Sequence, residues 1–285
     1  MTKVGLVLEG GGMRGAYTAG ALAWLNDNNI DFDYSVGISS GAAYLACYLM
    51  NDKHTPYNMS VHYASDPAVI GAKAFAQEGH YVAYHYLFDH YLKEEEHFDI
   101  KPLVEAKPAM EFGVYDMEAG ETKWLKAEDL DENLDLLRAA CALPIASAKV
   151  KYKGKYYLDG GITKMIPIER AIEQGCDKFL VITTKPKGFV RKPANKAVIA
   201  MMKVFYRKFP KVLKDYRVRH INYQKQMKII EDLVAKKDAV LMRPSVSIPI
   251  SRFKGDPENL QKLYDLGYQD MEQNRSAILA LFAKD

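Results

Sequence analysis

The sequence has few cysteines and no long apolar run. Three cysteines among 285 residues (Cys47, Cys141 and Cys176) are odd in number and share no CxxC or other ligand spacing, so they indicate buried thiols in a reducing compartment. No stretch approaches the roughly 18 to 20 apolar residues that a membrane span needs. The apolar stretch before Glu9 is too short for the core of a signal peptide. We therefore expect a cytoplasmic protein.

Compositional bias is also missing. Apolar residues make up 48% of the chain and charged residues 26%, close to the globular average, which excludes a largely disordered chain. The 19 glycines and 12 prolines are ordinary in number, which excludes collagen-like and low-complexity classes. Without an internal repeat or a long linker, we expect one compact α/β domain with helical elaborations.

The net charge of +3 hides an uneven distribution. Residues 191–238 hold 14 lysines and arginines against four acids, so this segment carries +10 and the rest of the chain about −7. Such a segment favours contact with anionic surfaces, either lipid headgroups or nucleic acid, although composition alone favours the simpler explanation of a solvated helical face. The absence of an RRM, helix-turn-helix or zinc-finger pattern argues against nucleic acid.

Two consecutive strand–turn–helix units open the chain. Residues 3–8 are apolar without polar alternation, as expected of a strand buried on both faces, and a glycine-rich turn leads into a helix. Residues 34–37 form a second short strand, followed by a second turn and an apolar helix. This order predicts a parallel sheet with helices on its faces.

Later elements extend this pattern. Residues 55–105 are rich in aromatics and histidine and are expected to be helical, without a strong strand signal. We predict strands at 109–115, 121–126, 178–184 and 239–243, a hairpin over 148–161 that turns near Lys153-Gly154, and helices over 131–143, 194–237 and 257–283. The fold class is therefore three-layer α/β/α with a mainly parallel central sheet and extra helices at the C-terminus.

The sharpest chemical pattern is Gly37-Ile38-Ser39-Ser40-Gly41, a G-x-S-x-G between a strand and a helix. Such a turn holds its middle serine in a strained conformation with the hydroxyl presented, and the helix N-terminus points free N–H groups toward it. Ser39 is the candidate nucleophile. The alternative is that Ser39 or Ser40 only caps the following helix.

Residues 10–15, Gly-Gly-Gly-Met-Arg-Gly, satisfy G-x-G-x-x-G after a strand. The loop could cradle a dinucleotide pyrophosphate or aim N–H groups at a developing oxyanion. A dinucleotide site needs an acid at the end of the second strand, where this chain has Ser39, so the oxyanion interpretation is favoured.

A third pattern is Asp159-Gly160-Gly161 at the exit of a hairpin strand. Taken alone, it is compatible with an ordinary turn. The ordered set of GGGxRG, GxSxG and DGG resembles the patatin-like phospholipases. Residues 139–144 are also similar to that family's ASxAxP segment, and residues 181–193, 205–211 and 263–271 look like its bacterial branch, so the resemblance covers most of the chain.

The resemblance departs at two places. Many relatives carry Asn five residues after the motif aspartate, where this chain has Lys164. The ASxAxP segment begins here with Ala139-Ala140 instead of Ala-Ser.

The resemblance implies a lipid acyl hydrolase that needs no cofactor or metal and acts on phospholipid, lysophospholipid or a related acyl ester. Ser39 would attack the carbonyl, and Asp159 would accept its proton with no histidine between them. The expected oxyanion donors are the amides of Gly10, Gly11, Gly12 and Met13. The remaining motif residues are Arg14, Gly15, Gly37, Gly41, Gly160 and Gly161. Residues 1–190 would form the catalytic domain, and 191–285 a basic helical extension packed on the same domain.

Three further possibilities stay open. A Ser39–Asp159–His220 triad would match the chain order of α/β-hydrolases, although His220 lies within a basic helical stretch. A non-catalytic lipid-binding protein on a hydrolase fold is the second. Peripheral contact of residues 191–238 with anionic membrane, at its cytoplasmic face, is the third.

The histidine- and aromatic-rich segment gives no metal site. His80, His85 and His90 recur every five residues, which sweeps around a helix instead of lining one face. The aromatics between them suit a lid or an acyl groove over the active site as well as ordinary core packing.

Overall fold

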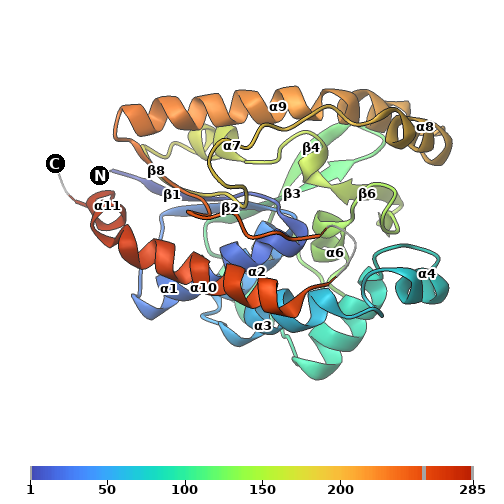
Figure 1. Ribbon diagram of the computed structural model, residues 1–285, viewed down its shortest axis with the longest axis horizontal. Helices are drawn as coiled ribbons and strands as arrows, with labels where there is room; N and C mark the ends of the chain where they lie inside the picture. Colours follow the sequence, from blue (N-terminus) through green and yellow to red (C-terminus); the bar gives the residue numbers. More distant parts are fainter. Residues whose placement is uncertain (1, 252–254, 284–285) are drawn as a thin grey trace.

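Eight strands form one sheet in the computed structural model, which describes residues 2–251 and 255–283 (Figure 1). They are β1 (Val4–Leu8), β2 (Tyr34–Ile38), β3 (Met110–Asp116), β4 (Glu121–Lys126), β5 (Val150–Tyr152), β6 (Lys155–Asp159), β7 (Lys178–Ile182) and β8 (Ala239–Met242). The order is β5-β6-β3-β2-β1-β7-β8, with β4 paired to β3. Each predicted strand is present.

Strands β3, β2, β1, β7 and β8 run parallel, whereas β4 and β6 pair antiparallel with β3, and β5 pairs with β6. The hairpin of β5 and β6 turns at Lys153-Gly154, where both residues have positive φ. The sheet is therefore mainly parallel, as the sequence predicts.

Helices cover both faces of the sheet. They are α1 (Gly15–Asp27), α2 (Ser40–Leu49), α3 (His54–Tyr57), α4 (Ala72–Glu78), α5 (Lys101–Ala106), α6 (Asp135–Cys141), α7 (Ile168–Glu173), α8 (Lys196–Phe205), α9 (Pro210–Ala235), α10 (Pro257–Gln273) and α11 (Arg275–Ala280). In Figure 1, α7 and α9 lie above the sheet, and α1, α2 and α10 lie below it. The predicted three-layer α/β/α architecture is confirmed.

Alternate residues of the buried strands supply the two interfaces. Leu6 and Leu8 of β1 belong to the large core against α1, α2 and α10. Val7 points the other way, into a core with Tyr223 and Ile230 of α9. Because both faces are covered, these strands carry continuous apolar runs.

Helix α10 packs directly on α1 through two glycines. A Cβ atom added to Gly20 would lie 1.9 Å from the carbonyl oxygen of Tyr264, and one added to Gly267 would lie 2.1 Å from that of Tyr17. The two backbones touch at both points, so only glycine fits there.

Some predicted helices differ in extent. The segment 194–237 is two helices, because α8 ends before the turn that leads to Pro210. The segment 257–283 is broken at Asn274. Helix α6 starts later than predicted, and the Asp131 carboxylate accepts hydrogen bonds from the N–H groups of Asp135 and Leu136.

Residues 55–105 fold into short helical pieces, as expected. Two of them are π-helical, over Asn58–His62 and Tyr86–Glu95. Their strand content among the described residues is a single bridge between Ile70 and Val82. Across the described ranges, each helix is too short or too polar to cross a bilayer.

Candidate active site

Ser39 occupies a strained turn at the end of β2. Its backbone has φ 58° and ψ −130°, a conformation that L-residues rarely adopt, and its side chain makes no hydrogen bond to the first turn of α2. Ser39 therefore does not act as a side-chain cap, which removes one alternative for this residue. Strain of this kind persists where the surroundings impose it, and it clusters at functional sites.

The glycines of this turn have a steric role. A Cβ on Gly37 would lie 2.6 Å from the carbonyl oxygen of Gly41, and one on Gly41 would lie 2.9 Å from that of Glu9. The following serine has a different task, because the Ser40 hydroxyl accepts a hydrogen bond of 3.1 Å from the Gly11 N–H. Ser40 thus binds the glycine loop, and Ser39 is left for chemistry.

Asp159 lies beside Ser39 because the C-terminal ends of β2 and β6 come together along the same edge of β3. Strand β2 pairs with β3 up to Ile38 opposite Gly113, and β6 arrives from the other direction with Asp159 opposite Val114. Ser39 lies close enough to Asp159 to act as a donor that lowers the pKa of the carboxylate, and both side chains are buried. The structure therefore brings these two predicted residues together.

Burial raises the pKa of Asp159 above its ordinary value. The Ser39 hydroxyl, the hydrogen bond from the Gly161 N–H at 2.7 Å and the charge of Arg219 act in the opposite direction. A carboxylate with a raised pKa is a stronger base, and these donors stabilise its ionised form.

Two of the four candidate oxyanion donors in the glycine loop already donate hydrogen bonds to other parts of the fold. Gly10 N–H donates to the Met165 carbonyl at 3.2 Å, and Gly11 N–H donates to Ser40. Within the part of the chain that the structure describes, the amides of Gly12 and Met13 have no hydrogen-bond partner. Gly12 adopts φ 54°, which favours glycine and turns this part of the loop away from helical geometry.

The buried carboxylate of Glu9 joins the glycine loop to the end of β7. Its Oε2 accepts hydrogen bonds from the Thr184 N–H at 2.5 Å and the Thr184 hydroxyl at 3.0 Å. Its Oε1 lies 3.7 Å from the Lys185 ammonium. Burial lowers the pKa of Lys185 to about 8, with the charges of Arg191, Arg14 and Arg219 acting in the same direction.

Helix α9 contacts both the turn that carries Asp159 and the loop that binds the glycine loop. Arg219 Nε donates to the Gly161 carbonyl at 2.6 Å, beside Asp159. The buried Gln226 side chain accepts hydrogen bonds from the N–H groups of Met165 (3.2 Å) and Ile166 (3.1 Å), and Met165 in turn accepts the bond from Gly10. The basic segment therefore contacts the site through its inward face.

Other predicted residues fall in supporting positions. Arg14 Nη2 donates to the Ile250 carbonyl at 3.0 Å, and a Cβ on Gly15 would lie 2.7 Å from the Ser40 hydroxyl. Gly160 lies against the Gly113 carbonyl. Lys164 pairs with Glu169 at 2.7 Å, and the Ala142 carbonyl accepts the Asp159 N–H at 2.9 Å.

His220 is not brought to the pair. Its Nδ1 is buried and lacks a hydrogen-bond partner among the described residues, and the groups that shift the pKa of Asp159 do not include it. The described residues also contain no group of three His, Cys, Asp or Glu side chains placed to hold a metal ion.

Several residues that support the site were not identified from the sequence. Glu9 could have been, because a charged residue directly after a buried strand needs partners in the fold. Gly113 within a strand also signals a close approach of backbones. Nothing in the sequence identifies Arg219 or Gln226 as part of the site, because the surrounding lysines and arginines indicate a solvated helix.

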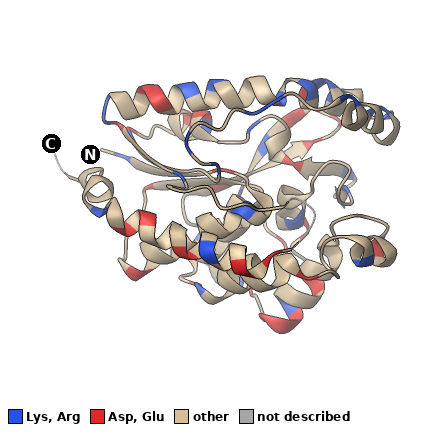
Figure 2. Cartoon of the chain, viewed as in Figure 1, with Lys and Arg blue, Asp and Glu red and all other residues tan. Residues whose placement is uncertain are grey.

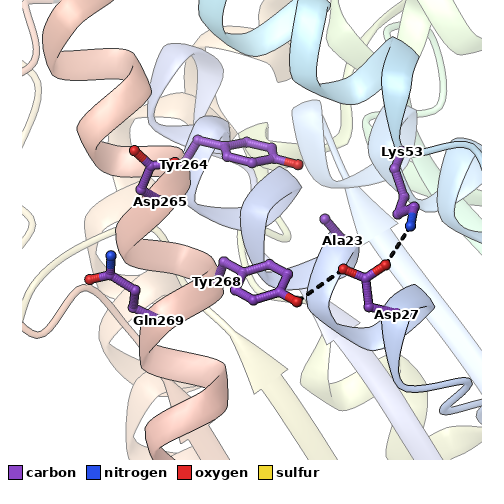
Figure 3. Close-up of a pocket in the computed structure, with 7 residues that line it drawn as sticks. All are labelled: Ala23, Asp27, Lys53, Tyr264, Asp265, Tyr268 and Gln269. Atoms are coloured by element: carbon purple, nitrogen blue, oxygen red, sulfur yellow. Dashed lines mark hydrogen bonds and ion pairs between the residues drawn. The ribbon is translucent and has the colours of Figure 1, made fainter.

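A separate groove lies on the seam of α1 and α10, where the Asp27 carboxylate bridges Lys53 and the Tyr268 hydroxyl (Figure 3). Asp27 ends α1, about 18 Å along that helix from Gly15 and the glycine loop. This groove is therefore distinct from the Ser39 site.

The fold places Ser39 and Asp159 together where β2 and β6 end along β3, in a mainly parallel sheet. In a comparison with known proteins, the model of the patatin-like phospholipase family matches residues 6–172. The chain belongs to this family. A domain of unknown function, DUF6363, matches residues 209–283, which include α9 and α10.

Two curated relatives match 67% and 59% of this chain. The uncharacterized protein YjjU of Escherichia coli (strain K12) is 27% identical over 67% of this chain and 54% of its own length. The probable lipid hydrolase 463L of Invertebrate iridescent virus 6 is 29% identical over 59% of this chain and 63% of its own. The match thus spans about half to two thirds of these relatives.

Among solved structures, the crystal structure of VipD from Legionella pneumophila aligns with a TM-score of 0.44 and 12% identity. The alignment covers 96% of this chain and 66% of that one.

The strain at Ser39 predicts an unusual order of stabilities. Ser39→Gly should be more stable than Ser39→Ala by about 1 kcal/mol, because glycine adopts this φ without the cost that alanine meets. Urea denaturation of both variants measures the difference. As a control, Ala43→Gly within α2 should lose about 1 kcal/mol relative to wild type. Equal stabilities of the two Ser39 variants would show that the turn is unstrained.

Proposed function

We propose that the protein is a serine lipid acyl hydrolase that cleaves carboxylic esters of phospholipids, lysophospholipids or related acyl lipids. The observation that carries the proposal is the buried pairing of the strained Ser39 with Asp159. Membership of the patatin-like phospholipase family and the likeness to a probable lipid hydrolase support it.

In the proposed reaction, Ser39 Oγ attacks the ester carbonyl while Asp159 accepts its proton. The resulting oxyanion accepts hydrogen bonds from the amides of Gly12 and Met13, and one such donor is typically worth about 3 kcal/mol. The C–O bond to the leaving alcohol then breaks, and Asp159 returns the proton to that alcohol. Water, deprotonated by Asp159, hydrolyses the acyl-enzyme and regenerates Ser39.

An apolar wall is available for the acyl chain. Tyr44 and Cys141 are buried and Tyr84 is half-buried. The charge of Asp159 contributes to raising the pKa of Tyr84 and Cys141, so these two side chains lie near the carboxylate. Tyr84 comes from the aromatic segment 55–105, which supports the proposal that this segment lines an acyl groove.

The pair predicts a specific mutational pattern. Ser39→Ala and Asp159→Asn should each lower the rate of p-nitrophenyl butyrate hydrolysis by roughly 10⁴, because the two residues act as one unit. His220→Ala should retain most of the rate. Circular dichroism of each variant checks folding.

Two outcomes would contradict this pattern. An equally large loss in His220→Ala would indicate a Ser–His–Asp triad instead. A wild type inactive on the short ester, on phospholipid and on lysophospholipid would favour a non-catalytic lipid-binding protein.

Arg219 predicts a pH effect. Its charge lowers the pKa of Asp159, so Arg219→Gln should raise that pKa. Because Asp159 must be ionised to accept a proton, the acid limb of the kcat/KM profile should move to higher pH. Arg217→Gln, an exposed neighbour on α9, is the matched control and should leave the limb in place. Identical profiles for both variants would rule out this role for Arg219.

We also propose peripheral contact with anionic membrane through residues 191–238. Helix α8 exposes Met201, Val204 and Phe205, at 41%, 71% and 63%, with Lys196 and Lys203 beside them. Lys and Arg also recur along α9 and the segment before α8 (Figure 2). Apolar side chains flanked by cations suit an interfacial helix on anionic lipid.

Co-sedimentation with vesicles tests the contact. Binding should be stronger to phosphatidylglycerol than to phosphatidylcholine vesicles, should fall with salt, and should drop several-fold in Val204→Ser/Phe205→Ser. Leu279→Ser on α11, at the other end of the molecule in Figure 1, serves as the control. Binding that ignores lipid charge would contradict the proposal.

A further inference from the structure

Four cationic side chains converge next to the Ser39 site from separate parts of the chain. Arg14 belongs to the glycine loop, Lys185 follows β7, Arg191 lies in the segment before α8, and Arg219 lies on α9. The charges of the three arginines all act on the Lys185 ammonium. From the sequence alone, Arg14 has no definite role, Arg191 and Arg219 belong to the basic segment 191–238, and Lys185 lies outside that segment.

The cluster lies where this fold places ligands. Strand β1 has β2 on one side and β7 on the other, so the chain order reverses between β1 and β7. In open α/β sheets, ligands bind at the carboxyl ends of strands at such a switch point. The residues at those two ends are the glycine loop and Thr184-Lys185.

Aromatic rings hold two of the cations in place. The Lys185 ammonium lies 6.0 Å from the centre of the Phe189 ring, and the Arg191 guanidinium lies 5.6 Å from the same centre. Arg191 also lies 4.9 Å from the centre of the buried Tyr223 ring of α9. A guanidinium stacked in this way has its orientation fixed before a ligand arrives.

Arg219 is fixed from the other side. Its Nε is bound to the Gly161 carbonyl, while its two terminal nitrogens have no hydrogen-bond partner among the described residues. These N–H groups form the fork that binds phosphate or carboxylate in a bidentate manner.

Positive charge exceeds negative charge at this place. The carboxylate of Glu9 lies 3.7 Å from the Lys185 ammonium and is also bound to Thr184. The Lys185 side chain is only 10% exposed, so water does little to stabilise its charge. Like charges gathered in a partly buried position repel one another, and an anionic ligand relieves that repulsion.

We propose that Arg14, Lys185, Arg191 and Arg219 bind the phosphate of an anionic lipid headgroup while the ester lies at Ser39. The inference rests on the proposed hydrolase function and specifies its substrate class. Asp159 interacts with groups from both faces of the sheet: Tyr84 and Cys141 belong to the core on the side of α1 and α2, whereas Arg219 lies on α9, which covers the opposite face. This arrangement matches an amphiphile that has an acyl chain on one side of its ester and a phosphate on the other.

A matched pair of substrates tests the site. 1-Oleoyl lysophosphatidic acid and 1-oleoylglycerol share the acyl ester and differ by the phosphate, and both are presented in neutral detergent micelles. The wild type should favour the phosphate-bearing lipid in kcat/KM. Arg191→Gln and Lys185→Gln should each lower that preference about tenfold or more. The control Lys187→Gln removes an exposed charge from the same loop and should keep the preference.

Each outcome separates the two proposals. No hydrolysis of either lipid overturns the hydrolase function itself. Hydrolysis of both with equal kcat/KM, or an equal loss of preference in Lys187→Gln, overturns the headgroup site and leaves the hydrolase intact. If Lys185→Gln fails to fold because Glu9 loses its partner, Arg191→Gln alone decides.

A competition arm distinguishes a headgroup from free phosphate. Glycerol 3-phosphate should inhibit hydrolysis of 1-oleoylglycerol more strongly than inorganic phosphate at the same concentration. Equal inhibition by the two would overturn the headgroup assignment in favour of a free-phosphate site.

Discussion

The structure is organised around the buried pair of Ser39 and Asp159. Burying a carboxylate is costly unless other groups stabilise its charge, so this pair requires donors and cations nearby. The fold supplies them through the Gly161 N–H and Arg219, and it supplies the approach itself by ending β2 and β6 head to head along β3. The strained Ser39 backbone is held by the strand on one side and α2 on the other.

Helix α9 makes the C-terminal segment part of the site. Asp215, Arg219 and Gln226 lie on one face of this helix and bind Tyr115 of β3, the Asp159 turn and the Met165 loop, respectively. Through the Met165 carbonyl, the last of these contacts extends to Gly10. The segment matched by the domain of unknown function therefore contributes groups that hold both the carboxylate turn and the glycine loop.

Local patterns were enough to predict the strands, the parallel order of β1 and β2 and the three motifs. These patterns are apolar runs, glycine turns and a serine between a strand and a helix. The roles of Arg219 and Gln226 could not be predicted, because one basic helix can present either a solvated or an inward face, and only the packing of Tyr223 and Ile230 decides which. The sequence also could not show that Ser40, and not Ser39, binds the glycine loop, since this depends on which hydroxyl faces the Gly11 amide. The domain boundary at residue 190 stays a prediction.

The central claim is that Ser39, activated by Asp159, is the nucleophile. Labelling with a fluorophosphonate ester followed by peptide mass spectrometry tests it most directly, because the reagent forms a covalent bond only with an activated serine. The account predicts one adduct, on Ser39, that is lost in Asp159→Asn and kept in His220→Ala. An adduct on Ser40, or undiminished labelling of Ser39 in Asp159→Asn, would contradict it.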